Sequence, residues 1–296
     1  MKKWYALIPA ASLFCVIAPT LQAIELVVEE PLEGVVDDVS CWRGYIPTGD
    51  FDNKALSFAP IPTWLFLYDD ASVEAFGSTA AVEEYILGQE DLATDHVFPN
   101  SGLAGLTIHI VVLPAPASLV TSDTTDPEEL WNRLVASKDV AAIRKAQHAS
   151  RVFLSVRRID GASGVGAQPT RPGDLANPLM GYAVVRTGTL YSAHTAFHEF
   201  GHSQGCGHDA AHPSALDALL PGRRGNKFSY ARGFCPSGAS EIMGVCGGDK
   251  IPAYSTPKVK YAGMTIGTTK ADCARAVNAN WNAAARLADV PYMPRR

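Results

Sequence analysis

Residues 196–209 read Ala-Phe-His-Glu-Phe-Gly-His-Ser-Gln-Gly-Cys-Gly-His-Asp, and the rest of the chain is best interpreted from this stretch. His198 and His202 are four residues apart, so on a helix they project from one face about one turn from each other. That separation allows two imidazoles to bind a single zinc ion. Glu199 lies next to the first histidine, where a carboxylate can take a proton from a zinc-activated water.

A glycine and a third histidine follow this pair at fixed offsets. Gly205 tolerates the positive φ at which many helices end, so the chain can turn back and present His208 as a third ligand. Three protein ligands leave the fourth zinc position to water, as in a catalytic site. A bare His-Glu-x-x-His also occurs by chance in surface helices, but the two added residues lower that chance by roughly two to three orders of magnitude. The longer motif therefore favours a catalytic zinc site.

Two more histidines flank the motif. His194 lies four residues before His198, and His212 lies four residues after His208. Eight residues of helix rise about 12 Å, whereas zinc–nitrogen bonds measure about 2 Å, so His194 and His202 cannot bind the same ion. We expect His194 to support a ligand or line the cleft, and His212 to lie in a loop.

The motif resembles the signature of the metzincin zinc peptidases, and Asp209 after the third histidine resembles their adamalysin/reprolysin branch. Metzincins carry a Met-turn downstream, and residues 240–246 fit it, with Met243 as the thioether beneath the ligands. Residues 251–263 resemble the segment that follows the Met-turn in bacterial reprolysin-like peptidases. Ser203 stands where relatives often have Asn. No tyrosine follows the Met-turn closely, which argues against a tyrosine as fifth ligand.

The resemblance covers roughly residues 62–288 and implies a metzincin-like α+β fold in two lobes. The upper lobe is expected to hold helices and a mostly parallel twisted sheet with an antiparallel edge strand beside the cleft. The lower lobe is expected to be irregular apart from the Met-turn and a C-terminal helix. Residues 181–187 occupy the place of the edge strand, so Val184 and Val185 are expected to line the substrate cleft. An open strand edge can hold an extended peptide by main-chain hydrogen bonds.

Hydrophobic periodicity supports this fold independently. The chain reads strand, helix, strand, helix, strand, which predicts a mostly parallel sheet covered by helices. Expected strands cover residues 64–68, 106–113, 152–156 and 181–187. Expected helices cover residues 78–97, one or two helices after Asp126, the histidine helix and residues 269–288, and a Gly/Pro-rich loop covers residues 161–178.

Composition limits the class of protein. The 296 residues are 47% hydrophobic and 19% charged, which describes a folded rather than a disordered chain. The formal net charge of −5 gives no electrostatic reason to expect nucleic acid as a partner. Residues 1–23 have the form of a signal peptide, with Lys2 and Lys3, an apolar run and a small-residue cleavage site at residues 21–23. The alternative is an uncleaved anchor, but the run is short and contains prolines.

We therefore expect a secreted or periplasmic mature protein without stable membrane insertion. Residues 24–60 are acidic and interrupted by prolines, and they form either a short propeptide or an extension lying on the domain. The catalytic domain is expected to cover residues 61–290.

Export permits disulfides, and five cysteines remain after signal removal. Cys235 and Cys246 bracket the Met-turn and are the best pair. An odd number leaves a free thiol, an intermolecular bridge or a cysteine with another role. Cys41 in the leader either fills the open zinc position, as a leader cysteine does in some metzincins, or forms a disulfide with Cys206 or Cys273.

A basic cluster lies between the third histidine and the Met-turn, in the segment that walls the specificity pocket of metzincins. Its members are Arg223, Arg224, Lys227 and Arg232. Either the cluster is a solvated loop, or one side chain points inward and pairs with a substrate carboxylate. The second interpretation predicts a preference for Asp or Glu directly after the scissile bond, and some bacterial relatives are peptidyl-Asp peptidases.

These features together predict a secreted zinc endopeptidase acting on a protein or peptide substrate. His198, His202 and His208 hold one catalytic zinc ion. Glu199 is the general base, and Met243 supports the site. One alternative is a zinc hydrolase of the same architecture acting on a non-peptide amide. Another is an exported binding protein with structural zinc, although such a site has no use for the carboxylate of Glu199.

Overall fold

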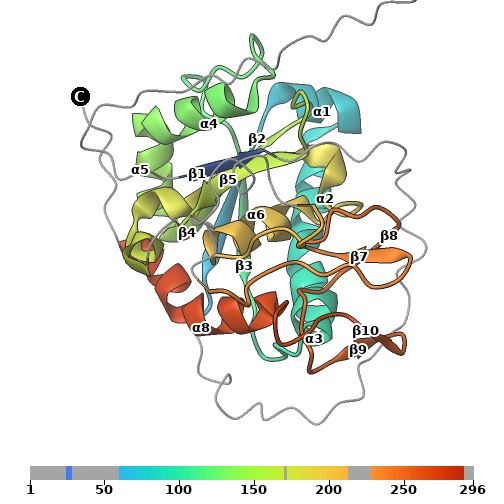
Figure 1. Cartoon of the computed structure of the whole chain (residues 1–296). Helices are drawn as coiled ribbons and strands as arrows, with labels where there is room; N and C mark the ends of the chain where they lie inside the picture. The colour runs from blue at the N-terminus through green and yellow to red at the C-terminus, as the bar shows by residue number, and fades with distance from the viewer. Residues whose placement is uncertain (1–24, 29–59, 170–171, 213–227, 290–296) are drawn as a thin grey trace, which may run out of the picture.

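A computed structural model describes residues 25–28, 60–169, 172–212 and 228–289 (Figure 1). Its centre is a six-stranded sheet made of β1 (Glu25–Val28), β2 (Thr63–Tyr68), β3 (His109–Pro114), β4 (Ala149–Val156), β5 (Gly164–Gln168) and β6 (Tyr182–Arg186). The strand order is β1-β5-β6-β4-β2-β3. Pairing is parallel between β3 and β2, between β2 and β4, and between β4 and β6. β5 pairs antiparallel with both of its neighbours, β6 and β1. The expected mostly parallel sheet is confirmed.

Helices cover both faces of this sheet. They are α1 (Asp70–Phe76), α2 (Thr79–Asp91), the π-helix η3 (Leu92–Val97), α3 (Phe98–Asn100), α4 (Pro127–Ala136), α5 (Lys138–Ala146), α6 (Thr195–Ser203) and α8 (Cys273–Ala285). Short 3₁₀ segments lie at Pro172–Ala176, Pro178–Gly181, Thr187–Thr189 and Arg286–Asp289. No helix in the described ranges is long and apolar enough to cross a membrane.

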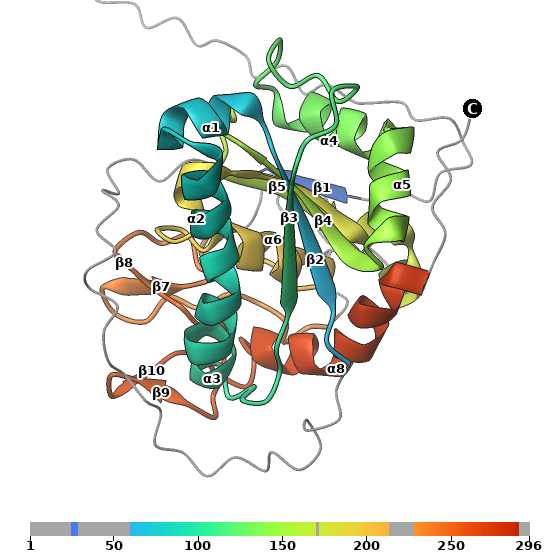
Figure 2. The ribbon, with the colours of Figure 1, turned by 180° about the vertical axis from the view of Figure 1, so that it is seen from behind.

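The alternation of side chains along β2 separates two cores. Trp64 and Phe66 join the core formed with α2, α6 and α8, whereas Leu65 and Leu67 join the core formed with α4 and α5. Figure 2 shows α4 and α5 on one side of the sheet and α2 on the other. Because both faces of β2 are covered, its residues form a continuous apolar run, as in other buried parallel strands.

The part of the chain after α6 is less regular. It contains two small two-stranded sheets, formed by β7 (Ala239–Glu241) with β8 (Asp249–Ile251) and by β9 (Lys260–Tyr261) with β10 (Met264–Thr265). These lie below α6 in Figure 1, and α8 closes the same side of the molecule. An irregular lower half that ends in a helix is what the sequence predicts.

The antiparallel strand is not where the sequence analysis places it. The strand expected over residues 181–187 is β6 (Tyr182–Arg186), which pairs in parallel with β4 and lies inside the sheet. The antiparallel strand is β5, within the loop expected over residues 161–178. Val184 and Val185 are fully buried, one in each core, so they do not line a cleft. An interior strand has no free edge and no exposed face, which excludes the predicted role.

Most expected helices are confirmed, with shifted ends. Ser78 caps α2 by accepting a hydrogen bond from the third residue after it, and the helix expected over residues 78–97 continues after α2 as the π-helix η3. Asp126 caps α4 and Ser137 caps α5, so two helices follow Asp126. The strand expected over residues 106–113 begins only at His109.

Two acidic residues cap the helices that follow them. Asp69 comes directly after β2 and accepts a hydrogen bond from Ser72 N at 2.8 Å as the cap of α1. Asp272 accepts from Arg275 N at 3.2 Å and begins α8. The helix expected over residues 269–288 therefore begins only at Cys273, after Asp272 as its cap.

The predicted signal peptide, residues 1–23, lies outside the described residues, and so does most of the predicted leader. The exception is β1, which pairs antiparallel with β5 from Glu25 opposite Gln168 to Val28 opposite Val165. Both views show β1 alongside β5 above α6 (Figures 1 and 2). A short segment of the leader thus forms the outermost strand at this edge of the sheet.

Candidate active site

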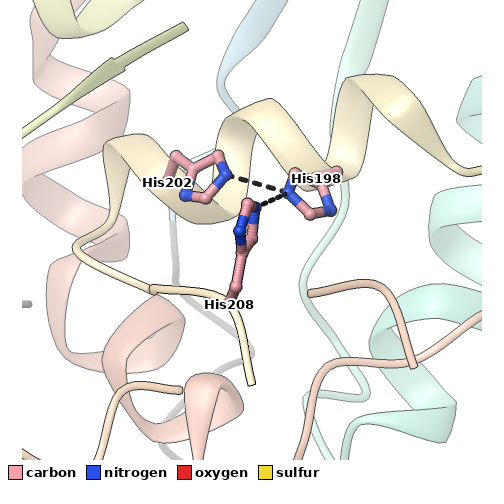
Figure 3. A group of neighbouring side chains, drawn as sticks. All are labelled: His198, His202 and His208. Atoms are coloured by element: carbon pink, nitrogen blue, oxygen red, sulfur yellow. Dashed lines mark hydrogen bonds between the residues drawn. The ribbon is translucent and has the colours of Figure 1, made fainter. Parts of the chain in front are cut away.

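Aromatic packing fixes the position of α6, the helix of the His-Glu-x-x-His motif. Phe197 and Phe200 project from its inner face, with ring centroids 5.5 and 5.0 Å from that of Trp64 on β2. Phe98 and Trp281 complete the cluster. With α6 held on this side, His198 and His202 project from its other face, toward the irregular half of the protein (Figure 3).

Three histidines bring their Nε2 atoms together. The Nε2 atom of His198 lies 2.8 Å from that of His202 and 3.3 Å from that of His208 (Figure 3). All three residues are buried, and one nitrogen from each lies within 4.8 Å of the others. Tetrahedral zinc with bonds of about 2.0–2.1 Å holds ligand nitrogens about 3.3 Å apart.

The opposite ring nitrogens fix the tautomers. Nδ1 of His198 donates to the carbonyl oxygen of Ile242 at 2.6 Å, and Nδ1 of His202 donates to that of Cys206 at 2.9 Å. A carbonyl oxygen only accepts, so each of these Nδ1 atoms carries the proton and each Nε2 keeps its lone pair for a metal. The donor set, its spacing and its tautomers therefore fit a zinc ion.

The turn after α6 follows the sequence prediction. Gly205 adopts φ 88°, and its N–H donates to His202 O at 2.8 Å. Gly207 then pairs with Ala231 and Gly233 on the returning chain through hydrogen bonds of 2.9 and 2.8 Å. The loop that carries His208 is thus fixed on both sides.

Two glycines that the sequence analysis did not identify make room for the carboxylate of Glu199. A Cβ atom on Gly164 would lie 2.6 Å from Glu199 Oε1, and one on Gly166 would lie 2.7 Å from Oε2. Both glycines belong to β5, and Glu199 itself is buried. The antiparallel strand therefore lies directly against the predicted general base. The Gly-Val-Gly alternation at residues 164–166 was the available signal.

The predicted Met-turn lies against the histidine helix. Met243 is fully buried, and a Cβ atom on Gly201 of α6 would overlap its sulfur atom. Ile242, the preceding residue, supplies the carbonyl that orients His198. This turn therefore contacts the helix through both its side chain and its backbone.

Glu241 holds the Met-turn in place and was also missed by the sequence analysis. Its Oε1 accepts a hydrogen bond from Phe234 N at 2.8 Å, and its Oε2 accepts from Met243 N at 3.1 Å and Ser255 N at 3.0 Å. Burial raises the pKa of Glu241 to about 7, although these N–H groups and Lys250 lower it. One carboxyl group thus ties three separate segments together beneath the site.

Asp209 makes a second polar connection. Its Oδ2 accepts from Val245 N at 3.2 Å, while its Oδ1 accepts from Ala211 N and from the backbone and ring of His212. Burial raises the pKa of Asp209, but the bonds from His212, Val245 and Ala211 outweigh burial and leave that pKa lowered. As predicted, His212 lies in an irregular segment outside the histidine cluster.

The remaining predicted residues have mixed outcomes. The expected disulfide between Cys235 and Cys246 is present, with Cα atoms 6.1 Å apart. Cys206 and Cys273 are buried thiols, and Cys206 Sγ lies 3.8 Å from Cys273 O. Cys41 lies outside the described residues, so neither of its predicted roles is tested.

His194 lies at the N-terminal end of α6, with φ 54°, and is fully buried. Burial, with a smaller contribution from Lys250, lowers the pKa of His194 to about 3, so the ring is neutral at ordinary pH. It is not part of the convergent histidine group. His194 therefore lies buried where α6 begins, four residues before the first predicted ligand.

Only one member of the predicted basic cluster falls within the described residues. Arg223, Arg224 and Lys227 lie outside them. Arg232 is half-buried and pairs through its backbone with Gly207, directly before His208. Within the described ranges its guanidinium makes no ion pair. The structure thus brings Arg232 beside the loop of the third histidine.

Comparison with known proteins adds a family and a fold. A reprolysin-type model of Metallo-peptidase family M12 matches residues 62–255. A search of curated proteins gives no match. One solved chain, from a structure described as a chaperone–substrate complex, is similar with a TM-score of 0.57 and 17% sequence identity. The similarity covers 77% of this chain but only 36% of that one, so it shows the fold alone.

Proposed function

The chain belongs to metallo-peptidase family M12, and we propose that it is an exported zinc endopeptidase. The convergence of His198, His202 and His208 carries this proposal, because their three Nε2 atoms are spaced as zinc ligands are and those of His198 and His202 keep their lone pairs for a metal. When bound, zinc polarises the scissile carbonyl and lowers the pKa of the attacking water. Every other step falls to groups of the chain itself.

Glu199 is the proposed general base. Glu199 follows the first ligand directly, and its carboxylate lies against Gly164 and Gly166. A side chain at either glycine position would overlap this carboxylate. A carboxylate confined in this way is positioned to take a proton from the attacking water and to pass it to the leaving amine. Burial beside β5 also excludes bulk water from the carboxylate, which strengthens its electrostatic interactions.

The substrate is proposed to be an extended peptide that pairs with β5. This strand takes the cleft role that the sequence analysis assigned to Val184 and Val185, because it is the strand against Glu199. Main-chain hydrogen bonds to a strand edge hold a peptide without requiring a particular sequence. Arg232 is the described candidate for sequence preference, since it lies beside the His208 loop.

Export is proposed from the signal-like segment at residues 1–23. The disulfide between Cys235 and Cys246 supports this proposal, because such bonds persist in oxidising compartments. A secreted or periplasmic location follows from both features.

The test combines metal content with peptide cleavage. We expect Glu199→Ala to keep stoichiometric zinc while its turnover of unfolded casein falls about 10²- to 10⁴-fold, the usual contribution of a general base. Glu84→Ala, at an exposed glutamate on α2, is the matched control and keeps wild-type turnover. A Glu199→Ala variant with wild-type activity contradicts the mechanism. A zinc-loaded wild type that hydrolyses small amides but no peptide favours the non-peptide alternative, and one that hydrolyses neither favours a binding protein.

A further inference from the structure

Two buried thiols lie in contact where the irregular half of the protein begins and ends. Cys206 lies in the turn after α6, and Cys273 is the first residue of α8. The Cys206 thiol donates to Cys273 O at 3.8 Å, and the two thiols hydrogen-bond each other. A disulfide needs Cα atoms about 4.4–6.8 Å apart, a separation that two side chains in thiol–thiol contact can satisfy.

The surroundings of these thiols favour them as partners of each other. Both side chains are fully buried in the core that α6 and α8 share. The other two described cysteines, Cys235 and Cys246, are already bonded to one another. A disulfide from Cys41 to either thiol, the alternative left open by the sequence, would have to separate the buried pair.

A bond between these thiols would close the irregular half into a covalent ring. Residues 206–273 include the third histidine, the Met-turn and both small sheets. The hydrophobic cluster around the small sheets has four buried members, which are Ala239, Ile251, Ala253 and Ile266. Loop-rich units with small cores are typically held by disulfides. The two thiols are 67 residues apart in sequence, against 11 for Cys235 and Cys246, and a longer closed loop gives a larger entropic stabilisation.

Both ends of this ring are connected to the histidine site. Cys206 O accepts the proton of His202 Nδ1 at 2.9 Å. At the other end, Cys273 N donates to Ser255 Oγ at 3.0 Å, and Ser255 N donates to the Glu241 carboxyl group that holds the Met-turn. The bond would therefore tie the carbonyl that orients a zinc-binding histidine to the segment held by that carboxyl group.

We propose that Cys206 and Cys273 form a second disulfide, which closes residues 206–273 into a ring and restrains the turn that orients His202. The inference rests on the proposed export, because an oxidising compartment supplies the reagent. Each thiol loses one hydrogen, and the two electrons and two protons pass to a disulfide co-reactant, oxidised glutathione or a dithiol oxidoreductase, which becomes two thiols. Burial raises the pKa of Cys273 well above its ordinary value, so the bond forms during folding, before the core closes around the thiols.

The first measurement maps the bonds in the exported chain. The protein, in the Glu199→Ala background to prevent self-cleavage, is denatured, alkylated with N-ethylmaleimide without reductant and digested with trypsin. Cleavage after Lys and Arg keeps Cys235 and Cys246 together in residues 233–250 and places Cys206, Cys273 and Cys41 in residues 187–223, residues 271–275 and a leader peptide that ends at Arg43. We expect residues 187–223 to be linked to residues 271–275, with the maleimide on Cys41.

A second arm makes the result independent of the expression host. The purified protein is reduced, unfolded, refolded in a mixture of reduced and oxidised glutathione, and mapped in the same way. We expect the same link. Cys41→Ala is the matched control, because it removes a cysteine outside the pair. It should keep the link and leave no thiol for the maleimide.

Stability and zinc affinity measure what the bond does. Cys206→Ala and Cys273→Ala each break the same bond, so each is expected to melt about 5–15 °C below the wild type, and the double variant at the same temperature as either one. Losses of two unbonded thiols would instead add. Cys273 is not one of the zinc-binding residues. A zinc affinity about tenfold weaker in Cys273→Ala, measured by competition with a chelating dye, therefore reports restraint that passes through Cys206.

The outcomes separate this inference from the proposed function. Maleimide on both thiols after refolding with oxidised glutathione, or a link from either thiol to Cys41, overturns the disulfide. Additive melting shifts with unchanged zinc affinity overturn the restraint on the site. A link that forms on refolding but is missing from the expressed protein upholds the pairing and overturns the proposed export. A linked, zinc-loaded wild type that cleaves no peptide upholds the pairing and overturns the peptidase proposal.

Discussion

The two sides of the histidine site are held by different forces. On the helix side, Phe197 and Phe200 bury the inner face of α6 among the rings of Trp64, Phe98 and Trp281. On the Met-turn side, backbone N–H groups donate to two buried or partly buried carboxyl groups, and a disulfide brackets the turn. The two sides meet where His198 donates to Ile242 O.

The difference shows how the chain positions ligands with and without regular structure. A helix and a sheet satisfy their own backbone groups, so apolar burial alone can hold them. An irregular turn has backbone N–H groups without such partners, and side-chain acceptors must supply them. We therefore expect the helix side to respond to lost volume and the Met-turn side to respond to a lost acceptor.

The largest expected effect is on the helix side. Phe197→Ala removes a fully buried ring from the aromatic cluster and is expected to lower the free energy of unfolding by about 3–5 kcal/mol. Urea denaturation of the zinc-loaded protein measures this loss. Leu87→Ala, at a 45% exposed side chain on α2, is the control and should change stability by less than about 0.5 kcal/mol. A loss below about 1 kcal/mol for Phe197→Ala would show that packing does not fix α6.

The next effect concerns activity rather than stability. Gly166→Ala puts a methyl group 2.7 Å from Glu199 Oε2 and 3.4 Å from Glu199 Cβ, so the carboxylate has to move. A displacement of about 1 Å at a catalytic group can cost roughly 10²-fold in rate. We expect a kcat lower by about that factor with zinc content unchanged. Gly188→Ala is the matched control, because a Cβ there meets nothing within 4 Å. Equal turnover in both variants would show that β5 does not position the carboxylate of Glu199.

On the Met-turn side, Glu241→Gln tests a single acceptor. The amide retains one oxygen and presents an NH₂ group to a backbone donor, which leaves a buried N–H unsatisfied at a cost of about 1–3 kcal/mol. A loss of both zinc affinity and stability in this variant would confirm that the carboxyl group of Glu241 holds the Met-turn in place. A variant as stable as the wild type would contradict that role.

The same variant gives a pH signature with a defined sign. The folded pKa of Glu241, about 7, is above the ordinary glutamate value of 4.5, so folding favours the protonated carboxyl. The contribution of Glu241 is complete below about pH 4.5 and is lost as pH rises through about 7. Glu241→Gln cannot titrate, so we expect it to gain stability relative to the wild type over this interval. Other groups titrate in both proteins and cancel in the difference.

The helix side could be predicted from the sequence better than the Met-turn side, and the reason is physical. Ligand spacing and apolar periodicity are regular, so His198, His202, His208 and the helices around them could be located. β5 was missed because two glycines replace the β-branched residues that identify a strand, and those glycines are needed beside Glu199. The edge role then went to Val184 and Val185, whose strand has the stronger pattern.

The hydrogen bonds that hold the Met-turn side had no comparable signal in the sequence. Glu241 is one acidic residue near an irregular turn, and its three donors come from segments up to 14 residues away. Hydrogen bonds of that kind depend on the path of the chain, which no local period encodes. The disulfide could be predicted because cysteines are few and two of them bracket the turn.

The smallest expected effect tests whether the Met-turn side also selects the substrate. Arg232 is half-buried, and its backbone pairs with Gly207 directly before His208, which makes it the described member of the basic cluster to test. An arginine can bind a carboxylate through two parallel hydrogen bonds, and a charge-assisted bond contributes about 1.5–3 kcal/mol. We expect the wild type to prefer Asp or Glu directly after the scissile bond, and Arg232→Ala to reduce that preference about tenfold without changing cleavage before apolar residues. Arg157→Ala, at an exposed arginine, is the control. New N-termini from a digested peptide library measure the preference. A wild type with Asp and Glu at background would place the guanidinium outside the substrate path, and the Met-turn side would then support the metal without contributing to specificity.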